Sequence, residues 1–123
     1  MRVLVCGGRN YGDHVHVNDV LNALHAERPI SAIITGAASG ADQLASKWAQ
    51  RRGVRVDEYP ADWRRFGLSA GPLRNKLMLD AGHPAIVVAF PGGKGTANMV
   101  WAAKAAGIEV RYADRDPVDG MLR

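Results

Sequence analysis

The chain contains a single cysteine, so an internal disulfide and a cysteine-based metal cluster are both excluded. Its four histidines do not have the spacing of a metal site either: two lie two residues apart and the others are isolated. We therefore expect no bound metal. Scarce cysteine is typical of a reducing compartment, and we expect a cytoplasmic protein.

Long apolar segments are also missing. None approaches the ~20 residues of a membrane-spanning helix, and the first six residues run into glycines instead of forming the apolar core of a secretion signal. We expect no membrane association. Aromatic residues make up only 7% of the chain and the formal net charge is +4, so a nucleic-acid partner is not required, whereas an anionic ligand such as a nucleotide is allowed.

The 123 residues, 47% of them hydrophobic, are enough for one domain with a real core and leave no room for a second. We expect a single domain over residues 1–123, with a core over about 2–112 and a polar C-terminal tail over 113–123. Apolar runs at 2–6, 30–35, 54–59, 85–90 and 108–112 are typical of strands, and they alternate with helical patterns. The helices are expected at 14–28, from the 36–42 turn to Arg52, at 72–81 and at 97–107.

This alternation predicts an α/β fold: a single Rossmann-like domain with a mostly parallel sheet of about five strands and helices on both faces. In the helix expected at 72–81, the apolar stripe consists of Leu73, Leu77 and Ala81. Ligands of such sheets bind beyond the carboxyl ends of the strands. Glycine-rich or polar segments follow four of the predicted strands, at 7–13, 36–42, 60–71 and 91–96, so we expect one ligand site at that edge.

The segment 91–96, Pro-Gly-Gly-Lys-Gly-Thr, joins a predicted buried strand to a predicted helix. Unpaired backbone N–H groups and the helix dipole at such a junction favour an anion. Glycines allow close approach of a ligand, while Lys94 and Thr96 offer a charge and a hydroxyl. The segment has neither the P-loop spacing nor that of G-x-G-x-x-G. The alternative is a turn whose glycines serve only tight packing.

Each of the other candidates in these segments has a structural alternative. Arg9 either clamps a phosphate or is a solvated loop residue. Tyr11 either stacks on a base or, as we favour, covers the core. For Asp42 we favour a capping box with Ser39 as N-cap, and the alternative is a group facing a ribose hydroxyl. Cys6, on the first strand, is expected to be buried and inert.

The long connection at 60–71 and the helix after it carry the remaining candidates. Trp63 is either a lid that stacks on a base or a plug at the sheet edge, and Asp62 is a candidate acid. Arg74 lies on the helix near the expected ligand site, where it either binds a phosphate or is a surface arginine.

Taken in order, the segments Cys6–Tyr11, Thr35–Asp42, Tyr59–Trp63 with Ala70–Asn75, and Ala89–Thr96 resemble the SLOG superfamily, and within it the YspA/YpsA-related branch of bacteria and phages. The resemblance covers about residues 2–112. It implies a Rossmann-like domain that binds a nucleotide or a nucleotide-derived molecule, requires no cofactor and assembles as a homo-oligomer.

Two further groups resemble the chain more distantly. LOG enzymes, which are often miscalled lysine decarboxylases, cleave the N-glycosidic bond of nucleoside monophosphates. They carry a helical arginine and the motif P-G-G-x-G-T-x-x-E, to which Arg74 and residues 91–96 are similar. Met99 stands at the glutamate position, and a thioether cannot handle the water or stabilise the cation of glycosidic cleavage. The single-stranded DNA-binding protein DprA has a motif similar to Thr35–Asp42.

We therefore expect a module that binds a nucleotide-derived signal, as sensor or sequestering protein. One alternative is a LOG-type nucleotide N-glycosidase that uses Arg74 with Asp42 or Asp62. The other is a DprA-like accessory protein that binds single-stranded DNA, and this nucleic-acid partner is the less favoured one. The resemblance and the motifs imply that the ligand contacts Gly7, Gly8, Arg9, Tyr11, Thr35, Gly36, Gly40, Asp42, Trp63, Arg74, Asn75, Pro91, Gly92, Gly93, Gly95 and Thr96.

Overall fold

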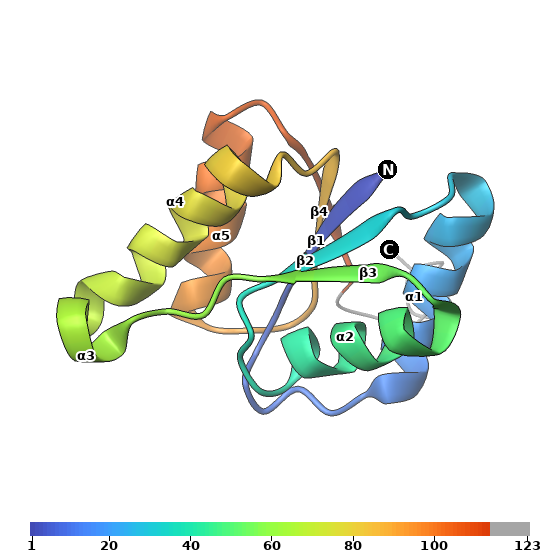
Figure 1. The fold of residues 1–123 in the computed structure, drawn as a ribbon, viewed down its shortest axis with the longest axis horizontal. Coiled ribbons are helices and arrows are strands. Elements are labelled where there is room, and N and C mark those ends of the chain that lie inside the picture. Colours follow the sequence, from blue (N-terminus) through green and yellow to red (C-terminus); the bar gives the residue numbers. More distant parts are fainter. Residues whose placement is uncertain (114–123) are drawn as a thin grey trace, which may run out of the picture.

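Five short strands form one sheet, and all the neighbouring pairs are parallel (Figure 1). A computed structural model describes residues 1–113, so the polar tail predicted at 113–123 lies outside the described residues from position 114 onward. The strands lie in the order β3-β2-β1-β4-β5. They are β1 (Arg2–Cys6), β2 (Ala32–Thr35), β3 (Arg55–Glu58), β4 (Ile86–Ala89) and β5 (Glu109–Tyr112). The predicted fold class is confirmed, with a fully parallel sheet.

Helices cover both faces of this sheet (Figure 1). One face carries α1 (His14–Glu27) and α2 (Ala41–Arg52), and the other carries α4 (Ala70–Gly82) and α5 (Lys94–Ala105). Each face has its own apolar core, one around Trp48 and Phe90 and the other around Met78 and Met99. Within residues 1–113, the helices are all too short or too polar to cross a bilayer.

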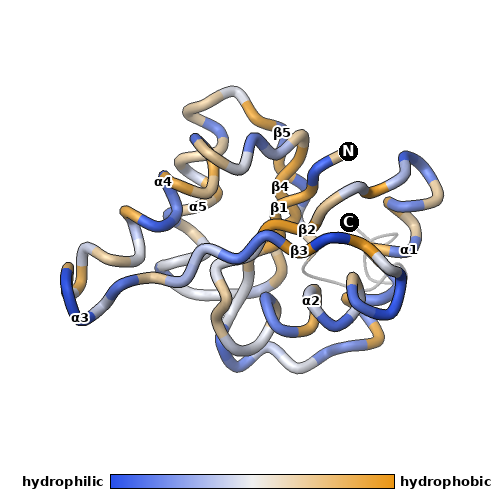
Figure 2. Tube along the Cα trace, in the orientation of Figure 1, coloured by the Kyte–Doolittle hydropathy of each residue, from blue (hydrophilic) through white to orange (hydrophobic). Residues whose placement is uncertain are grey.

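The burial of the strands follows from their place in the sheet. The three inner strands β1, β2 and β4 are almost entirely apolar and buried, because helices cover both of their faces. The edge strands β3 and β5 carry charged residues such as Arg55 and Glu109, which are exposed. Figure 2 shows hydrophilic colour along β3. Charges on an edge strand discourage pairing with a further chain.

Most helix ends differ from the prediction by one or two residues, and two differences are larger. The connection at 60–71 contains the four-residue helix α3 (Trp63–Phe66) and a 3-10 turn, η1 (Gly67–Ser69), because the Asp62 carboxylate accepts a hydrogen bond from the Arg65 N–H and caps the helix. Helix α5 begins at Lys94 rather than at residue 97. Its glycines indicated a turn, but they occupy the N-cap and the first turn of the helix, where a high helix propensity is not needed.

The apolar stripe predicted for α4 is also wrong. Leu73 and Leu77 are exposed, whereas the side of the helix that faces the sheet contains Met78, Leu79 and the polar Asn75. A polar side chain is buried here because its hydrogen bonds are satisfied by neighbouring groups. Periodicity alone therefore selected the wrong face of this helix.

The peptide groups of Gly8 join three of the loops at the carboxyl edge of the sheet. The Gly8 N–H donates to the Pro91 carbonyl at 2.7 Å, and the Gly8 carbonyl accepts from the N–H groups of Tyr11 and Ala41, each at 3.2 Å. Gly40 packs directly on this backbone with φ at +76°, and a Cβ there would lie 2.6 Å from the Arg9 carbonyl carbon. The loops after β1, β2 and β4 therefore hold one another in place.

We predict that Gly40→Ala lowers the free energy of unfolding by at least about 2 kcal/mol, because the new methyl group meets backbone atoms and the conformation itself favours glycine. Gly12→Ala is the matched control, since a Cβ at position 12 meets nothing within 4 Å. Urea denaturation of the three proteins measures the difference. Equal stability of the two variants would contradict the proposed role of this contact.

Candidate functional site

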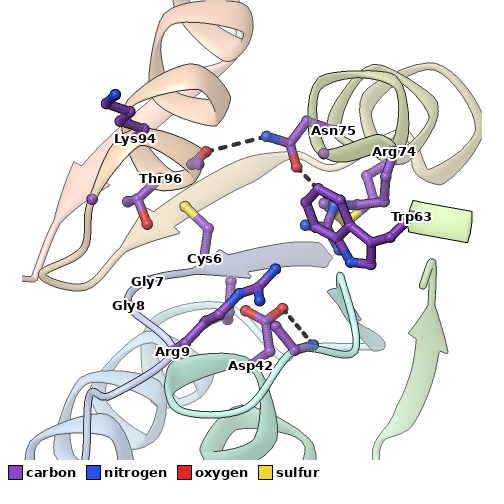
Figure 3. Close-up of a pocket in the computed structure, with 16 residues that line it drawn as sticks. Cys6, Gly7, Gly8, Arg9, Asp42, Trp63, Arg74, Asn75, Lys94 and Thr96 are labelled. Carbon is purple, nitrogen blue, oxygen red and sulfur yellow. Dashed lines mark hydrogen bonds between the residues drawn. The ribbon is translucent and has the colours of Figure 1, made fainter. Parts of the chain in front are cut away.

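A cavity of about 290 Å³ opens at the carboxyl edge of the sheet, where the loops converge (Figure 3). Four segments that are distant in the sequence form its walls: the loop after β1, the start of α2, the α3–α4 region and the start of α5. Its lining includes Gly7, Gly8, Arg9, Asp42, Trp63, Arg74, Asn75, Gly93, Lys94, Gly95 and Thr96. Ten of the residues predicted from the sequence to contact a ligand are thus gathered around one space.

The start of α5 forms the wall with the most free donors. The first intrahelical bond is that of the Ala97 N–H with the Gly93 carbonyl at 3.0 Å, so the N–H groups of residues 94–96 have no acceptor within the helix. The N-cap residue of the helix is Gly93, and no side chain caps these N–H groups. The exposed Lys94 and the half-buried Thr96 add an ammonium and a hydroxyl group. Together with the helix dipole, these groups favour an anion.

Arg74 projects from α4 into the opposite side of the cavity. Its Nη1 donates to the Gly36 carbonyl at 2.7 Å, and its Nε donates to Asn75 Oδ1 at 3.0 Å. A Cβ at Gly36 would lie 2.7 Å from Arg74 Cζ, so glycine at this position leaves room for the guanidinium in this orientation. The guanidinium is held at one end by these bonds, and its positive charge faces the cavity (Figure 3).

Asn75 connects α4 with the start of α5. Its side chain is 4% exposed, and its Nδ2 donates to the Gly95 carbonyl at 3.2 Å and to Asn98 Oδ1 at 3.0 Å. Since its Oδ1 accepts from Arg74, this amide uses both its donor and acceptor groups within the protein. We infer that Asn75 orients Arg74 and the first turn of α5 relative to each other.

Asp42 supplies the one carboxylate in the cavity lining. It is 7% exposed, and its Oδ2 accepts from the N–H groups of Gly36 at 3.0 Å and Ala38 at 3.2 Å. Burial raises the pKa of Asp42 to about 6, although these bonds and the nearby charges of Arg74 and Arg9 act in the opposite direction. Neither bond uses Oδ1, so this oxygen remains an acceptor on the cavity side.

The predicted capping box of Ser39 and Asp42 is wrong. Gly40 is the N-cap of α2, and the Ser39 hydroxyl donates to the Arg9 carbonyl at 3.1 Å instead. The left-handed φ of Gly40 turns the chain after Ser39, so the Ser39 side chain points to the neighbouring loop. The Asp42 carboxylate therefore stabilises the turn before its helix.

Arg9, from the loop after β1, and Trp63, the first residue of α3, meet at the cavity. The Arg9 Cζ atom lies 5.2 Å from the centre of the Trp63 ring, within the range of a cation–π contact. Trp63 is 44% exposed and both residues line the cavity. The ring is therefore one wall of the cavity, in contact with an arginine, and not a plug at the sheet edge; stacking on a base stays a prediction.

Other residues predicted from the sequence lie behind the lining. Tyr11 packs on Phe90, with ring centres 5.5 Å apart, and Thr35 is fully buried. The exposed Asp62 caps α3 and lies outside the cavity. Six of the predicted ligand contacts do not line this cavity: Tyr11, Thr35, Gly36, Gly40, Pro91 and Gly92.

The floor contains residues that the sequence did not mark as ligand contacts, namely Val5, Cys6 and Met78. Cys6 is the last residue of β1, and this position at the carboxyl end of a central strand is the signal that would have identified it. Burial raises the pKa of its thiol to about 12, so the neutral thiol forms part of an apolar floor. Within residues 1–113, no group of three or more His, Cys, Asp or Glu side chains could hold a metal ion.

Met99 does not face this cavity. Its side chain is fully buried in the core between the sheet and helices α4 and α5, and it is absent from the lining. The position at which the LOG enzymes carry glutamate therefore contributes no acid or base to the site of this chain.

Comparisons with known proteins agree with this architecture. The sequence model of the YAcAr family, described as the YspA, cpYpsA-related SLOG family, matches residues 1–66. The Gene 61 protein of Mycobacterium phage D29 is 38% identical over 117 residues, and the match covers 89% of this chain and 93% of that protein.

Two solved structures are similar in fold. The X-ray structure of TM1055 has a TM-score of 0.67 at 20% identity, covering 89% of this chain and 71% of that one. The X-ray structure of DNA processing protein A (DprA) from Streptococcus pneumoniae has a TM-score of 0.73 at 21% identity, covering 97% of this chain and 52% of that one. The present chain thus spans about half the length of DprA.

The raised pKa of Asp42 predicts a particular pH dependence of stability. A carboxyl that titrates near pH 6 in the folded state and near 3.8 in the unfolded state binds more protons when folded, so stability falls as pH rises through this window. At 1.36 kcal/mol per pKa unit the complete shift corresponds to about 3 kcal/mol, of which about 2 kcal/mol is lost between pH 4 and pH 7.

Asp42→Asn removes this titration and keeps one acceptor oxygen. We expect the stability of Asp42→Asn relative to the unsubstituted protein to increase from pH 4 to pH 7, as measured by denaturant unfolding at each pH. A constant difference between the two proteins over this range would show that the carboxyl is not perturbed.

Proposed function

Because the chain belongs to the YspA, cpYpsA-related SLOG family, we propose that its cavity binds a nucleotide or a nucleotide-derived small molecule. The observation that carries this proposal is the set of charged groups on opposite walls. Arg9 and Arg74 stand on one side and Lys94 with the free N–H groups of α5 on the other, while only one carboxylate, Asp42, is present in the lining. Such a site favours a ligand that has an anionic group at one end and polar groups at the other.

The different walls suit the different parts of a nucleotide. We assign the phosphate to the start of α5, where Thr96 and Lys94 add a hydroxyl and a positive charge to the backbone donors. Asp42 Oδ1 would accept a hydrogen bond from a sugar hydroxyl. The exposed face of Trp63 would stack on the base.

The size and the floor of the cavity agree with a small ligand. Its volume of about 290 Å³ is near the lower end of the ~300–1,000 Å³ that is typical of ligand pockets. Val5, Cys6 and Met78 give it an apolar base, and the polar groups lie around the rim (Figure 3). A sensor or a sequestering protein needs no more than this arrangement.

We predict that Lys94→Gln and Thr96→Val each weaken the binding of nucleoside monophosphates, about tenfold for the lysine because a charge-assisted contact is lost. Isothermal titration calorimetry with the four common monophosphates measures the affinities. Lys104→Gln is the control, since it removes the same charge from the same helix but lies outside the cavity lining. Unchanged binding in both cavity variants, or no binding by the unsubstituted protein, would refute the proposal.

Mass spectrometry of the small molecule released on denaturation complements this measurement. A nucleotide derivative recovered from the unsubstituted protein and lost from Lys94→Gln would identify the ligand class.

A second candidate function is a nucleotide N-glycosidase, and the pKa of about 6 at Asp42 favours it. A carboxylate with this pKa, at the edge of the cavity, is suited to take a proton from water at neutral pH. Water would attack C1′, the C1′–N bond would break, and its electron pair and a proton would go to the leaving base. The carboxylate would also stabilise the positive charge that develops on the sugar.

If this activity exists, Asp42→Asn lowers the release of free base from nucleoside monophosphates by at least about 100-fold, at the lower end of the 10²–10⁴-fold range of general acid–base catalysis. The rate of the unsubstituted protein should rise with pH through about 6, because the carboxylate must be ionised. Chromatography of the free base measures both. Hydrolysis that survives in Asp42→Asn would exclude this mechanism, while nucleotide binding without hydrolysis supports the binding module alone.

A further inference from the structure

The two aromatic residues of α3 each contact an arginine, one of them from the loop after β1, and they lead outward from the cavity. Arg9 Cζ lies 5.2 Å from the Trp63 ring centre, and Arg65 Cζ lies 5.0 Å from that of Phe66. Trp63 and Phe66 are three residues apart and therefore neighbours on the helix surface. They are 44% and 43% exposed, so both rings retain free area. The first ring lines the cavity and the second continues the same surface.

The position of α3 leaves this surface open to a large partner. Figure 1 shows α3 at one extremity of the molecule, beyond the start of α4 and away from the strands. It packs mainly against η1 and α4. The adjoining Leu68 is almost fully exposed, so α3 and η1 present aromatic and apolar groups that the described residues do not cover.

The charge of this surface is positive. The ion pairs found within residues 1–113 all lie elsewhere, and none of them involves Arg9, Arg64 or Arg65. Asp62 is the nearby acid, and its Oδ1 accepts from the backbone N–H of Arg65 at the helix cap. Arg64 and Arg65, which form no ion pair within residues 1–113, lie beside two half-exposed rings. This combination complements a polyanion that carries flat, unpaired bases.

We propose that α3 is a platform for single-stranded nucleic acid, with one nucleotide of the strand in the cavity, where its base stacks on Trp63, and the following base on Phe66. This inference rests on the proposed nucleotide binding in the cavity. Phosphates outside the cavity would contact Arg64 and Arg65. A duplex does not suit this surface, because its bases are paired and their faces are covered by stacking.

The test is fluorescence anisotropy of labelled six-nucleotide oligomers, dT₆ and U₆, between 50 and 200 mM salt. We expect both oligomers to bind at least about tenfold more tightly than the mononucleotide, because stacking and phosphate contacts are added. Arg64→Gln/Arg65→Gln should weaken oligomer binding about tenfold or more. The log–log salt slope should fall by ~1.4, since each phosphate neutralised on a single strand contributes ~0.7.

The matched control is Arg28→Gln/Lys47→Gln, which removes two exposed positive charges at the end of α1 and on α2. It should leave oligomer binding within about twofold, whereas Phe66→Leu should weaken it without changing the salt slope. Equal losses of oligomer affinity in the two double variants would overturn the proposal. The attraction would then depend on the net charge of the protein and not on the arginines of α3. Equal affinity for a six-base-pair duplex would overturn it too.

Binding of the mononucleotide, measured by calorimetry in the same variants, separates this inference from the proposed function. If the α3 variants keep mononucleotide affinity and lose oligomer affinity, both proposals stand. If mononucleotides bind but the oligomers bind no more tightly, the platform is refuted and the cavity is not. If an acidic peptide displaces the oligomer from α3 and binds more tightly, the surface is a protein-docking site and the nucleic-acid proposal is wrong.

Discussion

The backbone hydrogen bonds of Gly8 hold together the edge of the sheet on which the whole site depends. One N–H and one carbonyl connect the loop after β1 with the loops before α2 and α5. Loops at the end of a parallel sheet otherwise have no ladder of hydrogen bonds between them. Because side chains at positions 8 and 40 would separate these backbones, the glycines here serve packing. Their role in the approach of a ligand stays a prediction.

The charges around the cavity form a second level of organisation. Arg74 is oriented by a backbone carbonyl and by Asn75, and Asp42 by two backbone N–H groups. Neither side chain depends on a ligand for its orientation, so the site is preorganised for polar recognition. The raised pKa of Asp42 shows that burial outweighs the neighbouring arginines at this position.

Much of the fold could be predicted from the sequence, because parallel strands covered on both faces leave continuous apolar runs such as 86–89. Grouping of the cavity residues followed from the rule that ligands bind at the carboxyl ends of strands. The errors arose where a local signal competes with tertiary contacts. Leu73 and Leu77 have helical spacing but face outward, and α3 depends on a single aspartate cap.

Met99 also limits how this chain can change over evolutionary time. Its side chain is enclosed among Leu4, Met78 and Ala103, so a single substitution to glutamate would place an unpaired carboxylate in an apolar core. Several neighbouring positions would have to change first to give that acid a path to the cavity. A single substitution therefore does not convert this chain to the LOG motif in a usable form.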